Sequence, residues 1–388
     1  MKQTLTLVCK LQPSEKQVAK IEATLKAFAD ACNYANQVVK PAITSKRTIQ
    51  SLVYDSIREQ FGLSANLAVR VCARVGANRK TAKVKGKPVK AFKPTSADYD
   101  ARIFAFREKD WSASLTLNGG REHIKLQVAN YQMGKLKGRT PTSAQLCKHT
   151  DGLYYLHIQL TDVAPEPIRS NKVIGVDFGR RDIAVTNHGD RWDGKQIKDT
   201  RDKFARVRAS LQQKASQGTK STRKGCRRAL KRLSGRERKY QTWLNHTISK
   251  AIIADAKAKN AIVAIEDLTG IRERTNQKPR NKTERRRSNS WAFYQLRQFL
   301  EYKGVAVGVE VIAVPPAYTS QTCHQCLHIG LRLDKIFKCG NCSWHGDADF
   351  NAANVISLLG GAFVSLPERS VLACSLNELQ ARAKAPRL

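Results

Sequence analysis

Acidic residues are scarce in this chain of 388 residues, which has 32 Asp and Glu against 69 Lys and Arg. A protein keeps a formal net charge of +37 only when a polyanion normally neutralises it. The chain also has no apolar run long enough to span a bilayer and no basic amphipathic anchor at a terminus. These absences exclude a membrane as the partner and favour nucleic acid.

The chain also lacks the features of a secreted protein. Its first residues, MKQTLTLVCKL, have no unbroken apolar core of a signal peptide and alternate apolar with polar side chains, as a strand does. We therefore expect a reducing, cytoplasmic location. Six of the ten cysteines stand alone and are expected to be buried thiols: Cys9, Cys32, Cys72, Cys147, Cys226 and Cys374.

The first half of the chain combines helices with strands. Ser14 and Gln17 form a capping box that opens a helix, and further helices are expected over 46–60 and 64–80. From about residue 100 the apolar period changes to two, with a turn at Asn118-Gly119-Gly120. We expect residues 1–11 and 96–168 to form a β-barrel, with the helices of 12–95 inserted between its strands.

The second half, from residue 171, alternates strands with helices and is predicted to be α/β. The buried strand VIGVD ends at Asp177 and pairs with a strand at 183–185, and a second buried strand, AIVAIE, ends at Glu266. Residues 196–260 are helical and basic. A helix over 291–303, a strand over 309–314 and a final helix over 351–359 follow.

Three carboxylates stand where chemistry is possible: Asp177 and Glu266 end apolar strands, and Asp349 opens a helix. Taken singly, each reads as an ordinary turn or cap residue. Taken together at the rim of one sheet, they match two-metal phosphodiester cleavage, in which three or four carboxylates hold two Mg²⁺ ions ~4 Å apart. Asp347 competes with Asp349 for the third position.

Two Cys-x-x-Cys pairs lie directly before the third acid: Cys323 with Cys326, and Cys339 with Cys342, separated by a 12-residue loop. Four cysteines in two close pairs predict one tetrahedral, structural Zn²⁺. The neighbouring histidines are expected to be surface or nucleic-acid contacts rather than ligands: His324, His328 and His345.

The helical segment 201–240 contains 15 Lys and Arg but only two acids. Repulsion between these positive charges would destabilise the helices unless phosphates neutralise the charge. The candidate phosphate contacts are Arg223, Lys224, Arg227, Arg228, Lys231 and Arg232. A second basic run, 272–287, is expected to be either a disordered loop or a lid over the active site.

In order and spacing, VIGVDFG, AIEDL, the cysteine pairs and DFNAAN resemble the split RuvC-type nuclease of the transposon-encoded TnpB family, which compact type V CRISPR effectors share. SWAFYQLRQFLEYKG is similar to the family's linking helix. The resemblance covers 171–359, about half of the chain, and in 1–170 it rests on layout alone.

This resemblance implies an RNase H-like nuclease split over 171–318 and 343–388, a zinc ribbon at 319–342, a wedge barrel and a helical recognition lobe. The family's catalytic, Mg²⁺-binding acids fall on Asp177, Glu266 and Asp349, because the D-x-N-A-A pattern begins at Asp349. It further implies a prokaryotic, nucleoid-associated protein that uses a guide RNA from its own locus to cut double-stranded target DNA beside a short fixed motif.

Other functions were weighed against this one. A miniature CRISPR effector is barely distinguishable by sequence. A nuclease-dead, RNA-guided repressor would not need the three acids. VIGVDFG also resembles the phosphate-binding strand of sugar kinases and actin-like ATPases, but no second glycine-rich turn follows. A strand-joining transposase lacks its nucleophile motif here.

Overall fold

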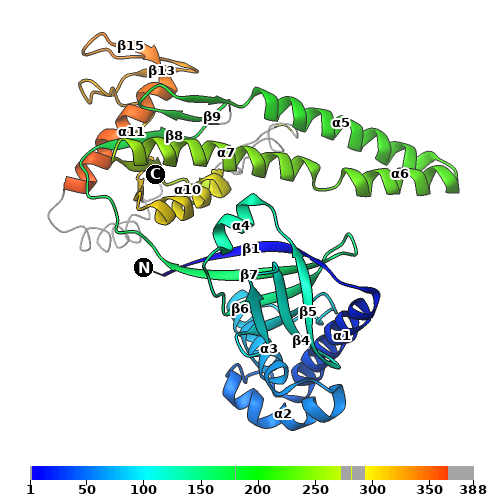
Figure 1. Cartoon of the computed structure of the whole chain (residues 1–388). Helices are drawn as coiled ribbons and strands as arrows, with labels where there is room; N and C mark the ends of the chain where they lie inside the picture. Colours follow the sequence, from blue (N-terminus) through cyan, green and yellow to red (C-terminus); the bar gives the residue numbers. More distant parts are fainter. Residues whose placement is uncertain (1, 180, 272–280, 282–292, 366–388) are drawn as a thin grey trace. The chain divides into compact units, whose positions relative to one another are not determined.

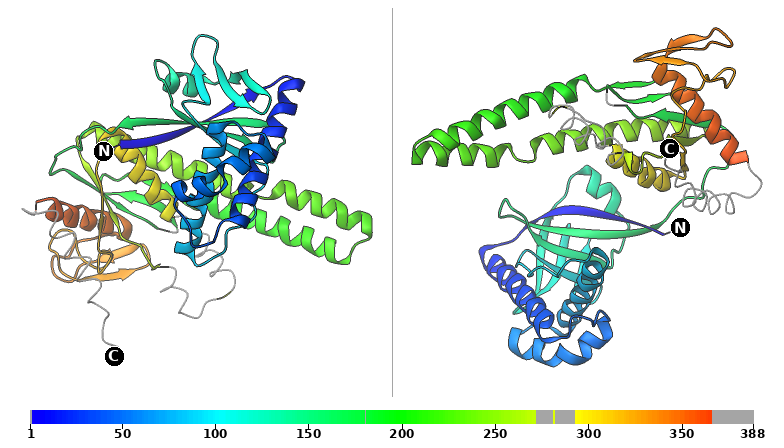
Figure 2. Two further views of the ribbon diagram at one scale, coloured as in Figure 1. Left: turned by 90° about the horizontal axis from the view of Figure 1, so that it is seen from below. Right: turned by 180° about the vertical axis from the view of Figure 1, so that it is seen from behind.

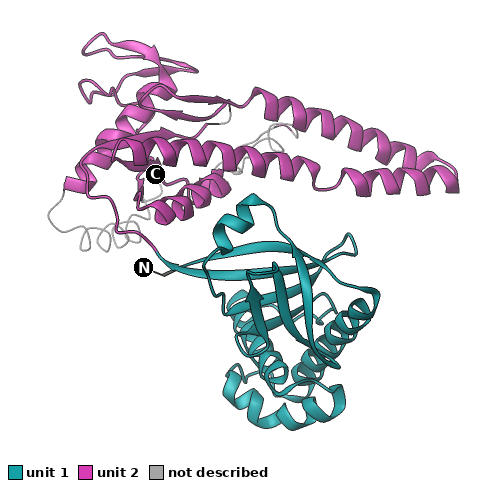
Figure 3. Ribbon diagram, viewed as in Figure 1, with its two compact units in different colours: residues 1–163 teal, residues 164–388 magenta. Residues whose placement is uncertain are grey.

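A computed structural model describes residues 2–179, 181–271, 281 and 293–365. The chain divides into two compact units, residues 1–163 and 164–388 (Figure 3). Cys374, most of the basic run 272–287 and the start of the helix expected at 291 lie outside the described residues. In the part of the chain that is described, no helix is both long and apolar enough to cross a membrane.

Unit 1 is built on one antiparallel sheet of seven strands in the order β2-β6-β7-β1-β5-β4-β3. The first strand lies at the centre of strands from much later in the chain, because it pairs with both β5 and β7. The ladders leave β2 and β3 as edges of the described sheet, so closure into a barrel stays a prediction. The strands are β1 (Lys2–Gln12), β2 (Ser96–Asp100), β3 (Phe104–Arg107), β4 (Ser112–Leu117), β5 (Gly120–Gln127), β6 (Ser143–Lys148) and β7 (Tyr154–Val163).

Three helices are inserted between the first two strands of this sheet: α1 (Glu15–Val38), α2 (Lys46–Phe61) and α3 (Ala65–Lys85). A short helix, α4 (Asn130–Leu136), follows β5. The predicted capping box is confirmed, since Ser14 accepts from the Gln17 N–H and the Gln17 side chain accepts from the Ser14 N–H. The inserted helices pack on the sheet in one core, where Phe28 and Leu115 are both fully buried (Figure 1).

Unit 2 contains a five-stranded sheet in the order β10-β9-β8-β11-β12. Three strands are antiparallel to one another, and β8, β11 and β12 run parallel. Every residue of β8, β9 and β11 is buried, as expected for strands covered on both faces. The strands are β8 (Val173–Asp177), β9 (Asp182–Thr186), β10 (Arg191–Asp193), β11 (Ile262–Glu266) and β12 (Val311–Val314).

Helices cover both faces of this sheet. On one face, α7 (Arg236–Ala258) and α10 (Phe293–Val307) pack on side chains such as Ile174 and Val263. On the other, α11 (Ala348–Ser365) packs on Val173 and Ala264. The basic helices α5 (Lys195–Gln217) and α6 (Lys220–Leu233) form a hairpin that projects beyond the sheet (Figures 1 and 2).

A small three-stranded antiparallel sheet stands between β12 and α11: β13 (Leu331–Leu333), β14 (Ile336–Lys338) and β15 (His345–Asp347). Its third strand lies beyond the expected ribbon boundary at 342. The final helix is also longer than the 351–359 expected, because it begins at Ala348 and ends at Ser365. The five single cysteines within the described residues are buried free thiols, as predicted: Cys9, Cys32, Cys72, Cys147 and Cys226.

Candidate functional site

The sheet of unit 2 brings two of the three predicted acids to one edge. Asp177 is the last residue of β8 and Glu266 the last of β11, and the two strands are parallel neighbours with Val176 opposite Ile265. Because the carboxyl ends of parallel strands meet at the same edge, the two carboxylates lie side by side there. Both are buried, with 8% and 9% of their surfaces exposed.

The third acid reaches this edge through the packing of α11 on β8. A Cβ on Gly175 would lie 2.0 Å from the carbonyl oxygen of Ala353, so glycine lets the helix backbone touch the strand. The Ser357 hydroxyl donates to the Val173 carbonyl at 2.8 Å and fixes the helix along the strand. Asp349, one turn before Ala353, is thereby buried near the end of β8, with 4% exposed.

The three carboxylates interact electrostatically. Burial, and then the charges of Glu266 and Asp349, raise the pKa of Asp177 well above its ordinary value. Burial also raises the pKa of Glu266, against a hydrogen bond that its Oε1 accepts from the Thr319 hydroxyl. Three acids that repel one another in a buried site are a charge arrangement that a bound cation would relieve.

Asp347 has a different structural role from Asp349. Its Oδ1 accepts from the backbone N–H groups of Asp349 and Phe350 at 3.0 and 2.8 Å, as an N-cap residue does at the start of α11. Its Oδ2 pairs with Arg191 at 2.7 Å. Asp349, and not Asp347, is the acid whose charge acts on Asp177, which favours Asp349 for the predicted third position.

Two cations from the β13–β14 hairpin contact the site, and sequence reasoning missed both. Arg332 donates to Asp349 Oδ1 at 2.8 Å. The Lys335 ammonium contacts the other oxygen of Asp349 and, at 2.7 Å, Asp182 Oδ2. Hydrogen bonds to these acids raise the pKa of Lys335, although burial lowers it. Spacing gives no signal for these residues, because they lie in the loop between the cysteine pairs.

The four predicted zinc ligands converge. The Sγ atoms of the four cysteines all lie within 4.8 Å of one another: Cys323, Cys326, Cys339 and Cys342. The Sγ atoms of Cys323 and Cys342 are 3.6 Å apart, and those of Cys326 and Cys339 are 3.5 Å apart. Tetrahedral zinc with Zn–S bonds of about 2.3 Å places sulfurs roughly 3.8 Å apart, so the cluster fits the ion. A hydrogen bond from the His328 backbone lowers the pKa of Cys326 to about 6, which favours the thiolate that zinc requires.

His324 has a structural role rather than a surface one. Its backbone N–H and Nδ1 both lie within 3.0 Å of the Asn351 side-chain oxygen, and its ring packs edge-on against Trp344. Asn351 is fully buried and also donates to the Thr322 carbonyl at 2.7 Å. These contacts attach the cysteine cluster to the first turns of α11, next to Asp349.

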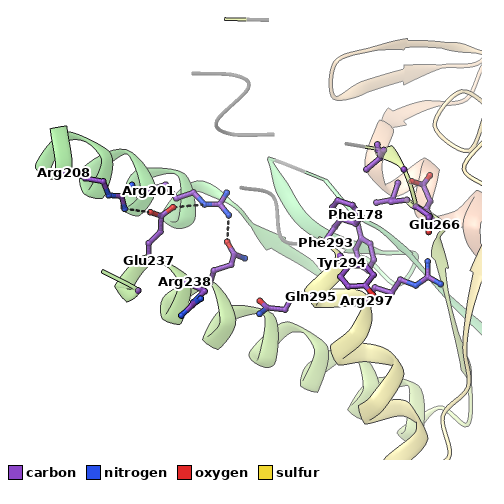
Figure 4. Close-up of a pocket in the computed structure, with 16 residues that line it drawn as sticks. Phe178, Arg201, Arg208, Glu237, Arg238, Glu266, Phe293, Tyr294, Gln295 and Arg297 are labelled. Carbon is purple, nitrogen blue, oxygen red and sulfur yellow. Dashed lines mark hydrogen bonds and ion pairs between the residues drawn. The ribbon is translucent and has the colours of Figure 1, made fainter. Parts of the chain in front are cut away.

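A cavity of about 580 Å³ begins at Glu266 and extends toward α5 and α7. In Figure 4, the rings of Phe178, Phe293 and Tyr294 gather near Glu266, and Arg201 and Arg208 lie farther along. Both arginines are paired with Glu237. The remaining lining residues include Arg238, Gln241 and Arg297. A cavity that is lined by several arginines and begins at Glu266 suits an anionic substrate.

The six predicted phosphate contacts all lie on α6, and all six are exposed: Arg223, Lys224, Arg227, Arg228, Lys231 and Arg232. The helix buries a single residue, Cys226. α6 therefore presents a cationic surface with almost no packing role, and the phosphate contacts stay a prediction.

Comparisons with known proteins agree with these features. Residues 293–356 match the family model described as Cas12f1-like, TNB domain. A TnpB-like protein of Methanocaldococcus jannaschii is 37% identical over 193 residues, which cover 48% of this chain and 66% of that protein. The Cas12f1 CRISPR-associated endodeoxyribonuclease of Sulfoacidibacillus thermotolerans is 30% identical over 241 residues, 58% of this chain and 54% of that protein.

The fold is similar to that of a solved structure. A Cas12f1–sgRNA–target DNA complex aligns with a TM-score of 0.63 at 14% identity, over 88% of this chain and 83% of that one. In sequence, the chain spans between about half and two thirds of the length of the curated relatives above. The chain is thus similar both to TnpB-like proteins and to compact CRISPR-associated endodeoxyribonucleases of the Cas12f1 kind.

Proposed function

We propose that this protein is an RNA-guided, Mg²⁺-dependent DNA endonuclease, and that Asp177, Glu266 and Asp349 are its catalytic acids. The observation that carries the proposal is the burial of these three acids at one sheet edge, where their charges act on one another. The sheet order, three antiparallel strands followed by two parallel ones, supports an RNase H-like nuclease. The similarity to a CRISPR-associated endodeoxyribonuclease supports the activity.

The chemistry of the three acids supports a divalent metal site, because oxygen ligands from carboxylates are what Mg²⁺ prefers. Asp177, Glu266 and Asp349 would hold the metal, which when bound would activate water and stabilise the leaving oxygen. Thr319 orients the Glu266 carboxylate through its hydroxyl, and the Asp347 cap fixes the first turn of α11 under Asp349. The arginines of the cavity bind and orient the strand.

The substrate and partner follow from the charge and from the relatives. A guide RNA from the protein's own locus would neutralise the excess of +37 and select the target by base pairing, while the protein binds backbone phosphates. The six exposed cations of α6 are the candidate contacts to that backbone. The structural Zn²⁺ would hold the hairpin that carries Arg332 and Lys335 against the acids.

The test is cutting of matched double-stranded DNA by purified protein with its native flanking RNA, in Mg²⁺ and in its absence. Asp177→Asn and Asp349→Asn should each abolish cutting while RNA binding is retained. Asp347→Asn is the matched control, because asparagine is as good an N-cap as aspartate and should leave cutting nearly unchanged. Undiminished cutting by the Asp349→Asn variant, or its loss in the Asp347→Asn variant, would reverse the assignment of the third acid.

A further inference from the structure

One side of α7 carries a row of aromatic rings that continues onto α10. Tyr240 and Trp243 stack with centroids 5.9 Å apart and planes at 30°. About one turn further along α7, His246 stacks on Phe299 of α10, with ring centroids 3.9 Å apart and ring planes at 15°. Tyr302 meets Phe299 edge-on at 5.8 Å. We call these five residues the aromatic row.

The row is held in place by polar contacts, yet part of it faces solvent. The Tyr240 hydroxyl donates to Gln196 at 3.3 Å. Lys303 donates to the His246 carbonyl at 2.6 Å and thereby joins α10 to α7. Burial, and then the charge of Lys303, lower the pKa of His246, which disfavours its charged form. Trp243 nevertheless stays 59% exposed and Tyr302 41% exposed.

The surroundings of Trp243 are cationic. Arg236, Lys239 and Lys250 are exposed and lie four or seven residues from Trp243, which places them within about 40° of it around the helix. The two acids of α7 lie on another side of the helix, since Glu237 and Asp255 are each about 120° away from Trp243. Glu237 is also paired with arginines of α5. A flat aromatic face among exposed cations is complementary to unpaired bases on a phosphate backbone.

We propose that the aromatic row stacks unpaired bases of the guide RNA, whose phosphates contact Arg236, Lys239 and Lys250. This inference rests on the proposed function. The strand is RNA rather than the DNA to be cut, because Arg238, which lines the cavity leading to Glu266, lies about 140° around α7 from Trp243. A strand stacked on Trp243 is therefore turned away from the acids and is the one that the protein keeps.

The experiment compares RNA binding by Trp243→Ala, Trp243→Phe and Tyr131→Ala, each in full-length protein that also carries Asp177→Asn. Tyr131 is the matched control, because its ring is 60% exposed but lies in unit 1, outside the row. Loss of one stacked base should weaken binding of the native flanking RNA roughly 5- to 150-fold in Trp243→Ala. Trp243→Phe should recover most of the affinity, and Tyr131→Ala should bind as the parent does.

A second readout is the fluorescence difference between the parent and Trp243→Phe, which RNA should quench. Equal RNA affinity of Trp243→Ala and its parent would overturn the inference and leave the proposed function standing. Absence of RNA binding by the parent itself would overturn both. A single-stranded DNA of the same sequence is the third arm: if Trp243→Ala weakens DNA binding but not RNA binding, the assignment to RNA is wrong.

Discussion

Replacement of Lys335 by methionine tests whether the ribbon hairpin neutralises the acid site. Lys335 contacts Asp182 and Asp349, whose side chains are 10% and 5% exposed, while its own is 28% exposed. Methionine keeps the length of the side chain and removes the charge. Without added Mg²⁺, the two carboxylates then lose one of their counter-ions in a site that already holds two further acids.

The expected loss of stability depends on how deeply Lys335 is buried and on which cations still pair with the two acids. Removing one partner of a fully buried ion pair costs roughly 3–5 kcal/mol, because the other charge is left unpaired. Lys335 is partly exposed, and Arg332 and Arg191 still pair with Asp349 and Asp182. We therefore expect a loss of about 2 kcal/mol, less than the fully buried case. For a unit of this size the thermal midpoint should fall by ~4–8 °C.

The assay is thermal unfolding in Mg²⁺-free buffer, without a chelator that would also remove zinc. Arg181→Ala is the control, because Arg181 pairs with Asp334 where both side chains are more than 60% exposed. Exposed pairs contribute roughly 0–1 kcal/mol, so this variant should barely change the midpoint. Added Mg²⁺ should reduce the difference in thermal midpoint between Lys335→Met and wild type. A shift no larger than that of Arg181→Ala would refute the reasoning.

Three further predictions concern the acids, the zinc and the packing of α11. Because the raised pKa of Asp177 favours its protonated form, its stabilising contribution is full below the unfolded pKa of about 4 and is lost as pH rises through the raised value. In metal-free protein, Asp177→Asn should therefore gain stability over wild type as pH rises in thermal unfolding. The affinity for Mg²⁺, measured by calorimetry, should rise more steeply with pH in wild type than in this variant, which keeps the raised pKa of Glu266. Cys326→Ser should lose the bound zinc in a metal assay, whereas Cys226→Ser should keep it; equal zinc contents would contradict the four-cysteine site. Gly175→Ala should destabilise the protein by ~2 kcal/mol or more, because its Cβ would meet a carbonyl oxygen of α11, but Gly225→Ala on exposed α6 should stabilise it by up to ~1 kcal/mol. Urea unfolding measures the change in the free energy of unfolding for each variant. A change of the same sign in both variants would count against the packing described.

Much of the fold can be predicted from the sequence because it depends on the chemistry of neighbouring residues. The Ser14–Gln17 capping box, the buried strands ending at Asp177 and Glu266, and the two cysteine pairs each follow from side chains close together in sequence. Segment lengths were less accurate. The final helix extends to Ser365, because small residues such as Gly360 let it continue along the sheet, where a Cβ would meet Ala264.

The aromatic row shows where sequence reasoning was incomplete. Tyr240, Trp243 and His246 recur every three residues among cations, a spacing that the sequence alone displays. Some aromatic residues of unit 1, by contrast, pack within the fold. Tyr154 is buried, and Tyr155 stacks on His149. Phe299 and Tyr302 come from another helix, so their part in the row required coordinates.

By itself, the sequence determined which acids end strands, which cysteines pair and that the surface needs a polyanion, because these depend on residue type and short spacing. Only the tertiary structure decided which charges meet. Asp349 reaches Asp177 across 171 intervening residues because Gly175 admits the backbone of α11, and Lys335 reaches Asp182 because the ribbon folds back on the sheet. Contacts of this kind depend on how helices and sheets pack, and no local pattern encodes that packing.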